Sequence, residues 1–336
     1  MDFSFVKVRM VTLALITLSS GVTSVFAAAE ECAGKADNLA RLECYDASAA
    51  QVKTVPTALQ RSYLTRSWDL DDKDEDLLGD DLSPLQPHRG AYLIVRRSSQ
   101  QNVTPSTPTY AANATPADID MTEIKFQISQ KAKIFNPVKI NFLGFTGFRL
   151  WGGYTQQSNW QAFNQGNSSP FRETNYEPEL ILTFNTGNQH GMKLLNLGYV
   201  HQSNGRDSSV SRSWNRVYLQ GGWETETFSL MLRGWRRMPD IDVLDDNPDI
   251  QDYMGRGEIK LRWEPLDHSQ VVDLTLRNNL SSTENRGFVQ LDWATPVYVS
   301  KSTKLHIQIT SGYGESLIDY NFQQTTVGLG VSFRDW

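Results

Sequence analysis

Apolar and polar residues alternate with a period of two along most of the chain after about residue 121. The stretches Ile124–Ser129, Glu258-Ile-Lys-Leu-Arg-Trp263 and Val272-Asp-Leu-Thr-Leu-Arg277 are clear examples. Successive side chains of a β-strand point to opposite faces, so this period predicts strands with one apolar and one polar face. The pattern recurs along the sequence, which indicates an all-β protein.

A soluble β-sandwich gives the same alternation, so other features must decide between the two. The polar positions often carry full charges, as at Lys260, Arg262 and Asp273, which suits a wall whose polar face lines a wet lumen. Connections alternate between long and short, and the chain ends on the aromatic residue Trp336. No stretch after residue 30 is long and apolar enough for a spanning helix. These features favour a transmembrane β-barrel.

In such a barrel the short connections lie on the periplasmic side and the long ones outside. Eleven strands then alternate in direction, and the first of them descends. Because bacterial single-chain barrels have even strand counts, Ala91–Val95 is assigned as a further ascending strand, which predicts an antiparallel barrel of twelve strands. Trp223, Trp263 and Trp293 then share the lower end as an aromatic girdle. The remaining predicted strands lie near 122–135, 140–156, 174–186, 192–204, 213–224, 227–237, 254–264, 270–280, 286–296, 304–314 and 322–333.

The chain begins with a targeting segment. Lys7 and Arg9 precede a short apolar run, and small residues follow up to Ala28. This order is typical of a cleaved secretory signal, and the apolar run is too short for the alternative, an uncleaved anchor. Residues 1–28 are therefore predicted to be a signal peptide that exports the chain.

Residues 29–90 are predicted to form a periplasmic, largely irregular N-terminal extension, with the barrel at residues 91–336. The extension contains the two cysteines of the sequence, Cys32 and Cys44, which in an exported chain are expected to form a disulfide. It also contains a charge run that begins at Asp69 and continues to Asp81. Such runs stay in water and are usually disordered.

Three polar residues suited to nucleophilic catalysis fall on the lipid-facing parity of two neighbouring strands. His201 and Ser203 have the parity of the outward Leu197, and Asn215 has the outward parity of the next strand. Polar groups that face hydrocarbon need partners, which a nucleophile, a base and an orienting group would give one another. Taken alone, His201 is more often an interfacial histidine. A nucleophile that faces the bilayer implies a substrate within it, an acyl ester of a phospholipid.

Longer strings around these residues resemble the signature of the outer-membrane phospholipase A family. The resemblance covers roughly residues 120–336, and the blocks stand in the family's order. It implies calcium-dependent hydrolysis of phospholipid acyl esters, of the phospholipase A1/A2 and lysophospholipase type, in the outer membrane of a Gram-negative bacterium. The blocks are His201-Gln-Ser-Asn-Gly-Arg206, Ser211-Arg-Ser-Trp-Asn-Arg216, Ser168–Pro178, Ser311–Asn321, Tyr154–Ser158, Asn247–Ile250 and Tyr253–Gly255.

The resemblance assigns a catalytic role to four residues. Ser203 would be the nucleophile, His201 the general base and Asn215 the group that orients it. The backbone N–H of Gly205 would help to bind the oxyanion, a position that suits glycine because its backbone can be approached closely.

The family also uses Ca²⁺ at the active site. The matching ligands are the carbonyl of Arg206, the hydroxyl of Ser211 and the carbonyl of Ser168 from a second protomer, which are the hard oxygen ligands that calcium prefers. Asp207 and Asp246 are candidates for a second, weaker calcium site. The alternative role for the acidic residues near 245–249 is solvated loop charge.

A ligand set divided between two chains implies that the homodimer is the active form, with Gln156 at the interface. The alternative interpretation is a catalytically silent outer-membrane barrel, a channel or a scaffold, which would need neither the nucleophile nor its base. A surface protease or adhesin barrel would need paired carboxylates in its mouth, and none stand out. The net charge of −6, with no basic stripe, argues against a nucleic-acid partner.

Overall fold

The computed structural model describes residues 61–70, 85–111, 115–134, 138–187, 191–239, 245–297 and 300–333, together with Asp37, Arg41 and Cys44. The chain divides into two units, residues 1–57 and 58–336. Cys44, in the first unit, is disulfide-bonded, and its expected partner Cys32 lies outside the described residues. The signal peptide and Trp336 also lie outside them.

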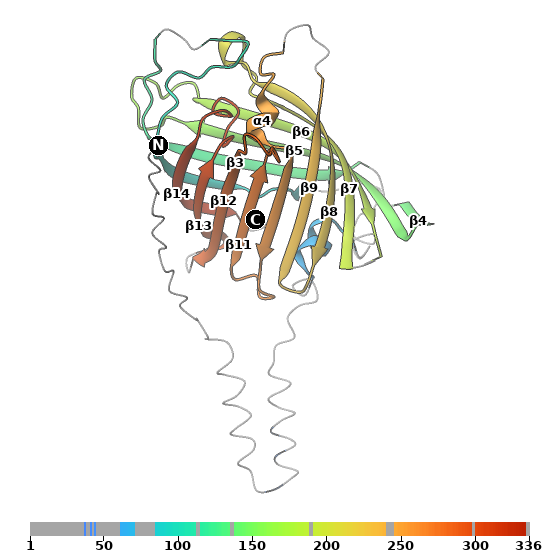
Figure 1. Ribbon diagram of the computed structural model, residues 1–336. Coiled ribbons are helices and arrows are strands. Elements are labelled where there is room, and N and C mark those ends of the chain that lie inside the picture. The colour runs from blue at the N-terminus through green and yellow to red at the C-terminus, as the bar shows by residue number, and fades with distance from the viewer. Residues whose placement is uncertain are drawn as a thin grey trace, which may run out of the picture. The chain divides into compact units, whose positions relative to one another are not determined.

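The second unit consists of antiparallel strands joined by turns and loops (Figure 1). Its described residues also form two short α-helices, α3 (Tyr63–Ser67) and α4 (Ile250–Met254). None of the helices in the described part of the chain is long and apolar enough to cross a membrane. The strands are β1 (Gln86–Pro87), β2 (Tyr92–Ser98), β3 (Thr122–Lys133), β4 (Val138–Phe142), β5 (Phe145–Trp160), β6 (Glu173–Asn185), β7 (Met192–Ser203), β8 (Ser213–Glu224), β9 (Phe228–Met238), β10 (Gly257–Trp263), β11 (Val271–Asn278), β12 (Gly287–Val297), β13 (Ser300–Gly312) and β14 (Gln324–Phe333).

The sheet closes into a barrel through two pairings. β14 pairs with β2, and β3 pairs both with β2 and with β5, so that the order from β5 to β14 returns on itself. β1 and β4 are short additions beside β3 and β5, which leaves the predicted twelve strands in the closed ring. The predicted strand at Ala91–Val95 is β2. The predicted strand near 140–156 is two strands, because Gly144, at a φ of +82°, helps to make a turn between β4 and β5.

The outer and inner faces of the wall follow the predicted parity. Leu197, Val327 and Leu329 are half exposed on the outside, as residues in contact with lipid would be. The register places Val272 between Trp263 and Trp293 on neighbouring strands, so these tryptophans lie at one level of the barrel. That level is at the short-turn end, which is where the aromatic girdle is expected.

The inside of the barrel is packed with paired charges. Arg262 holds both carboxylate oxygens of Asp273 at 2.7 Å, and His306 lies 3.0 Å from Asp292. Arg262 and Asp273 are buried, so the charge of each must be compensated by the other across the strands. A cavity of about 210 Å³, lined mainly by polar residues, remains between α3 and Leu317.

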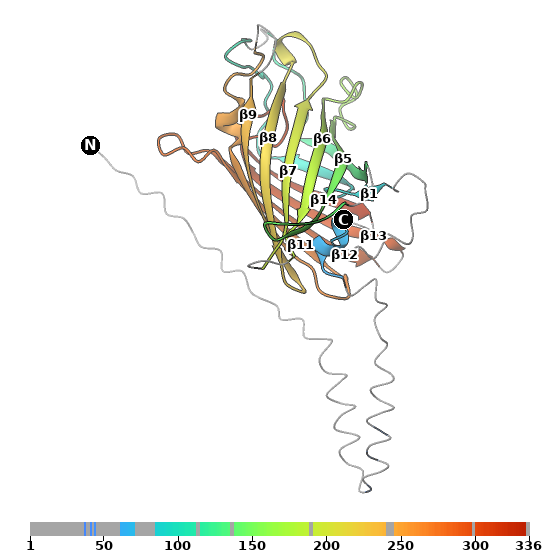
Figure 2. The ribbon, with the colours of Figure 1, turned by 90° about the vertical axis from the view of Figure 1, so that its right-hand side faces the viewer.

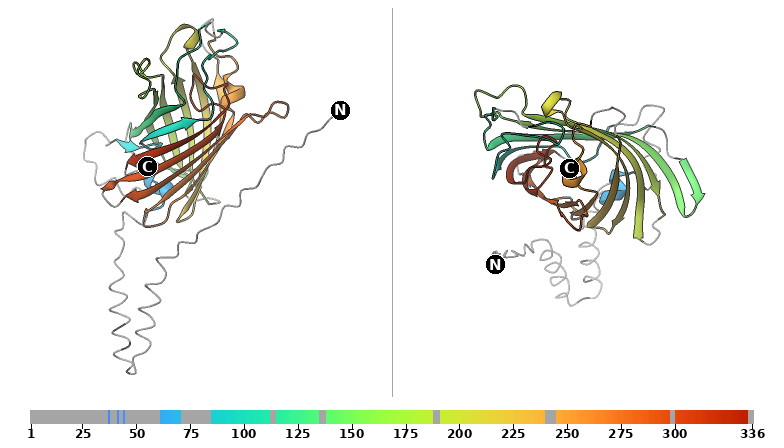
Figure 3. Two further views of the ribbon diagram at one scale, coloured as in Figure 1. Left: turned by 90° about the vertical axis from the view of Figure 1, so that its left-hand side faces the viewer. Right: turned by 45° about the horizontal axis from the view of Figure 1, so that its top comes forward.

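The segment 61–70 lies inside the barrel, at the end opposite the long loops (Figure 3). Trp68 packs edge-on against Trp151, and Lys131 Nζ lies 3.3 Å from the centre of the Trp68 ring. Asp69 is 4% exposed and is paired with Lys133 at 2.9 Å. The expectation of solvated charge is therefore wrong at Asp69, because a basic side chain inside the barrel neutralises it. The unit that contains the barrel also begins earlier than the predicted boundary at residue 90.

Candidate active site

His201 and Asn215 lie together on the outward face of the β7–β8 pair, at the end where the loop 204–212 joins the two strands. Figure 2 shows this pair of strands side by side in the barrel wall. The two residues are direct cross-strand partners, so the register alone places their side chains side by side. His201 Nδ1 lies 2.9 Å from Asn215 Oδ1. The hydroxyl of Tyr199, two residues earlier on the same face, donates to the same oxygen at 2.9 Å. The predicted base and its orienting group are therefore in contact.

Ser203 is the last residue of β7 and has the parity of His201, as predicted. Its cross-strand partners are Ser213 on β8 and Tyr176 on β6. Among the described residues no hydrogen bond joins Ser203 to His201. Catalytic hydrogen bonds are often long or misaligned in an enzyme without its substrate, so this separation does not exclude the pair from catalysis.

The loop 204–212 after Ser203 is closed by Asn204, which sequence analysis did not single out. Its backbone and that of Arg212 form a hydrogen bond of 3.0 Å, and its side chain bonds Val210 O and the N–H groups of Arg206 and Arg212. Gly205 follows with a φ of +62°, and a Cβ there would lie 3.2 Å from the ring of Tyr176. Both the conformation and the close contact favour glycine at this position.

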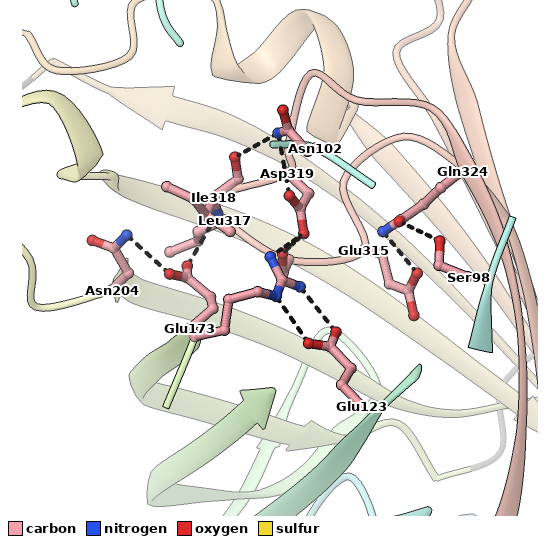
Figure 4. A network of polar contacts seen from close by, with 12 residues as sticks. Ser98, Asn102, Glu123, Glu173, Asn204, Glu315, Leu317, Ile318, Asp319 and Gln324 are labelled. Atoms are coloured by element: carbon pink, nitrogen blue, oxygen red, sulfur yellow. Dashed lines mark hydrogen bonds and ion pairs between the residues drawn. The ribbon is translucent and has the colours of Figure 1, made fainter. Parts of the chain in front are cut away.

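A buried network on the inner face supports the loop from behind (Figure 4). Glu173, which is fully buried, accepts hydrogen bonds from Asn204 Nδ2 at 3.3 Å and from the N–H of Ile318 at 3.0 Å. Arg172 joins Glu123 to Asp319 with bonds of 2.9–3.0 Å. The loop 313–323 and the loop after Ser203 are thus attached to one polar core. Only the family string around Asn204 could have pointed to this residue.

The expected calcium ligands lie in loops at this end of the barrel. Ser211 Oγ lies 2.5 Å from Asp246, whose other oxygen accepts a bond from the Tyr110 hydroxyl at 3.0 Å. That hydrogen bond raises the pKa of Tyr110. Asp207 is exposed, and no contact joins it to Asp246 among the described residues. Oxygen groups from Ser211 and Asp246 therefore converge, as a site for Ca²⁺ requires.

Two further residues of the predicted calcium set lie on adjoining loops. The side chain of Arg206 donates to the carbonyls of Phe171 and Arg172 at 2.9 and 2.6 Å, which joins its loop to the loop that carries Ser168. The Ser168 carbonyl accepts a bond from the indole of Trp160 at 2.8 Å. Among the described residues no three His, Cys, Asp or Glu side chains form a metal-binding group. Such a group is not what the prediction requires, since its ligands are mainly serine and main-chain oxygens.

Comparison with known proteins decides between an enzyme and a silent barrel. A family model described as phospholipase A1 matches residues 64–333. The chain belongs to the phospholipase A1 family. It is 38% identical over 255 residues to phospholipase A1 of Salmonella typhimurium, which covers 75% of this chain and 82% of the relative.

Solved structures of outer membrane phospholipase A agree in fold and sequence. Two from Escherichia coli, one of them an active-site mutant with an asparagine replaced by alanine, are 36% identical, with a TM-score of 0.63 over 76% of this chain and 94% of theirs. A third, from Salmonella typhi, is a dimer with bound calcium; it is 36% identical, with a TM-score of 0.61 over 74% of this chain and 92% of its own. The chain is therefore an outer-membrane phospholipase on a closed barrel of twelve antiparallel strands.

Proposed function

We propose that the chain hydrolyses acyl esters of membrane phospholipids with Ser203 as nucleophile, His201 as general base and Asn215 as the residue that orients it. Ser203 Oγ attacks the ester carbonyl while Nε2 of His201 takes its proton. The lysophospholipid leaves with that proton, and the acyl group stays on Ser203. His201 then activates a water molecule that releases the fatty acid. The Gly205 N–H donates to the oxyanion in both steps.

The observation that carries this proposal is the place of the His201–Asn215 pair on the outward wall. The 2.9 Å contact holds the imidazole on a surface whose lower part is half-exposed leucine and tyrosine. A base that faces the hydrocarbon serves a substrate whose acyl chains already lie there. The active-site asparagine of the Escherichia coli relative supports the same role for Asn215.

The oxygen ligands in the loops near Ser203 are of the kind that binds Ca²⁺. Ser211 Oγ and the Arg206 carbonyl supply neutral oxygens, and Asp246, in contact with Ser211, supplies a carboxylate or forms the weaker site together with Asp207. When bound, the ion would stabilise negative charge on the ester oxygen. The calcium in the Salmonella typhi relative supports this assignment.

The homodimer is the proposed active form, because the carbonyl of Ser168 completes the calcium site from a second protomer. Gln156 lies on β5 opposite Tyr176, which in turn lies opposite Ser203. Gln156, Tyr176 and Ser203 thus form a row across three strands that connects the proposed interface with the proposed nucleophile. Export by a cleaved signal peptide at residues 1–28, with the Cys32–Cys44 pair in a periplasmic segment before the barrel, completes the proposal.

The test is ester release from phospholipid–detergent micelles with calcium and with a chelator. Ser203→Ala should lose at least about a thousandfold in kcat, the scale expected for removal of a nucleophile. Ser213→Ala is the matched control, because Ser213 is the cross-strand neighbour of Ser203 and only its backbone makes the described contacts with Asn247. It should keep the wild-type rate. Equal activity of Ser203→Ala and wild type would remove the proposed nucleophile.

A further inference from the structure

One atom of the site, Asn215 Oδ1, is contacted by two side chains of the neighbouring strand. His201 Nδ1 and the Tyr199 hydroxyl both lie 2.9 Å from it. The two partners come from one strand, β7, and Asn215 comes from β8. Tyr199 is 46% exposed on the outward wall, so its ring faces the lipid while its hydroxyl reaches up to the amide.

This arrangement fixes the proton on the imidazole. A carbonyl oxygen only accepts hydrogen bonds, so the contact with Nδ1 requires a proton on that nitrogen. The neutral ring then has its lone pair on Nε2, the nitrogen that must accept the Ser203 proton. The direction in which the Asn215 amide points therefore decides whether His201 can act as a base.

An asparagine side chain, unlike an aspartate, can turn its NH₂ group instead of its oxygen toward His201. A half-turn of the amide would bring its NH₂ group to His201, and Nδ1 would then have to accept while Nε2 carried the proton. A phenol hydroxyl is a stronger donor than acceptor, so a tyrosine beside the amide favours the orientation that presents oxygen. The contact from Tyr199 is of this kind, with the hydroxyl as donor.

We propose that Tyr199 is a positioning residue that holds the Asn215 amide with its oxygen toward His201 and so keeps Nε2 free to act as base. The inference rests on the proposed function, since it needs His201 to be the base. In this role, Tyr199 selects which end of the Asn215 amide faces His201, a choice that the three catalytic side chains do not make by themselves.

Kinetics of four proteins test the inference: wild type, Tyr199→Phe, Asn215→Asp and the double variant. Tyr199→Phe should lower kcat about tenfold with KM unchanged, which corresponds to about 1.4 kcal/mol, one neutral hydrogen bond. A carboxylate presents oxygen at either end, so in the Asn215→Asp background the same change should alter kcat less than about twofold. An equal loss in both backgrounds, or no loss in either, would overturn the proposal. Leu197→Ala, one step down the same face, controls for disturbance of the wall and should keep the wild-type kcat.

The tautomer itself can be observed in ¹⁵N spectra of histidine-labelled protein in detergent micelles. His201, assigned by the signal missing in His201→Gln, should show a proton on Nδ1 in wild type and a mixture of the two tautomers in Tyr199→Phe. An unchanged tautomer in that variant would refute the proposal. Full activity of Ser203→Ala would instead refute the proposed function, whatever the result for Tyr199→Phe. Failure of the Tyr199 proposal and failure of the proposed function can therefore be distinguished.

Discussion

Replacing Asn204 by aspartate tests how the site depends on the buried network behind it. Asn204 donates to Val210 O at 2.8 Å and to Glu173 Oε2 at 3.3 Å, and it accepts from the N–H groups of Arg206 and Arg212. Asn204→Asp keeps the two acceptor contacts and the shape, but it loses both donors. It also places a carboxylate beside Glu173, and both positions are buried.

The magnitude follows from those two contacts. Each lost donor costs about 1 kcal/mol, and an acidic group against a buried acidic group adds repulsion that one of them must relieve by taking up a proton. Taking the lost donors and the repulsion together, we expect the native conformation of the loop 204–212 to be destabilised by roughly 2–4 kcal/mol. This loop carries Gly205, Arg206 and Ser211. The calcium concentration for half-maximal activity should therefore rise at least about tenfold, and kcat/KM should fall about a hundredfold, by the conversion of about 1.4 kcal/mol to a factor of ten.

The assay is hydrolysis in mixed micelles across a calcium titration, with electrophoretic mobility before and after heating as the check that the barrel is folded. Asn285→Asp is the matched control, since Asn285 is an exposed asparagine in the loop between β11 and β12 with similar contacts, to Asn278 and Ser281. It should behave as wild type. A folded Asn204→Asp protein with the wild-type rate and calcium dependence would refute the view that this loop is held from the barrel interior.

Three further predictions concern the proposed calcium ligand Ser211, the internal segment 61–70 and the pH dependence of stability. Ser211→Ala should raise the calcium requirement about tenfold or more while leaving the heat-modified mobility unchanged, because it removes an oxygen donor and not a core contact. Glu224 accepts four hydrogen bonds of 2.6–3.2 Å from Ser62, Leu64 and Thr65, so Glu224→Ala should weaken docking of the segment 61–70 by about 2–4 kcal/mol and expose it to trypsin in the folded barrel. Burial alone would raise the pKa of Glu315, but its basic neighbours Arg96 and Lys125 lower it to about 2. Since a depressed folded-state pKa contributes stability above the unfolded value of about 4.3, that stability should be lost as pH falls from about 4 to 2, and denaturant midpoints for Glu315→Gln should vary less than wild type across this window.

The wall of the barrel was predictable because its signal is local. Period-two alternation needs only neighbours in sequence, and it located the strands, their faces and the level of Trp263 and Trp293. The outward parity of His201 and Asn215 follows from the same rule. Their contact adds one further condition, the β7–β8 register, which the loop between them sets.

The interior was not predictable, because its contacts join distant parts of the chain. Glu173 receives the N–H of Ile318 from 145 residues away, and Asp69 is neutralised from β3. In the sequence, Asp69 opens an acidic run that is typical of a solvated segment. The neighbouring sequence does not distinguish a carboxylate that is solvated from one that is paired with Lys133 inside a barrel.

The two faces of the β7–β8 pair explain why part of the site is formed without substrate. On the inner face, Trp214 is fully buried and donates to Gln202 at 2.8 Å, and Arg216 stacks over its ring at 4.0 Å. These contacts fix β7 against β8 at the level of the outward His201–Asn215 bond, which is therefore held by rigid strands. Ser203 stands where the strand gives way to the loop, and no hydrogen bond joins it to His201 among the described residues. The proposed base and its proposed orienting group are thus positioned by the barrel, whereas alignment of the proposed nucleophile depends on the loop that carries the proposed calcium ligands.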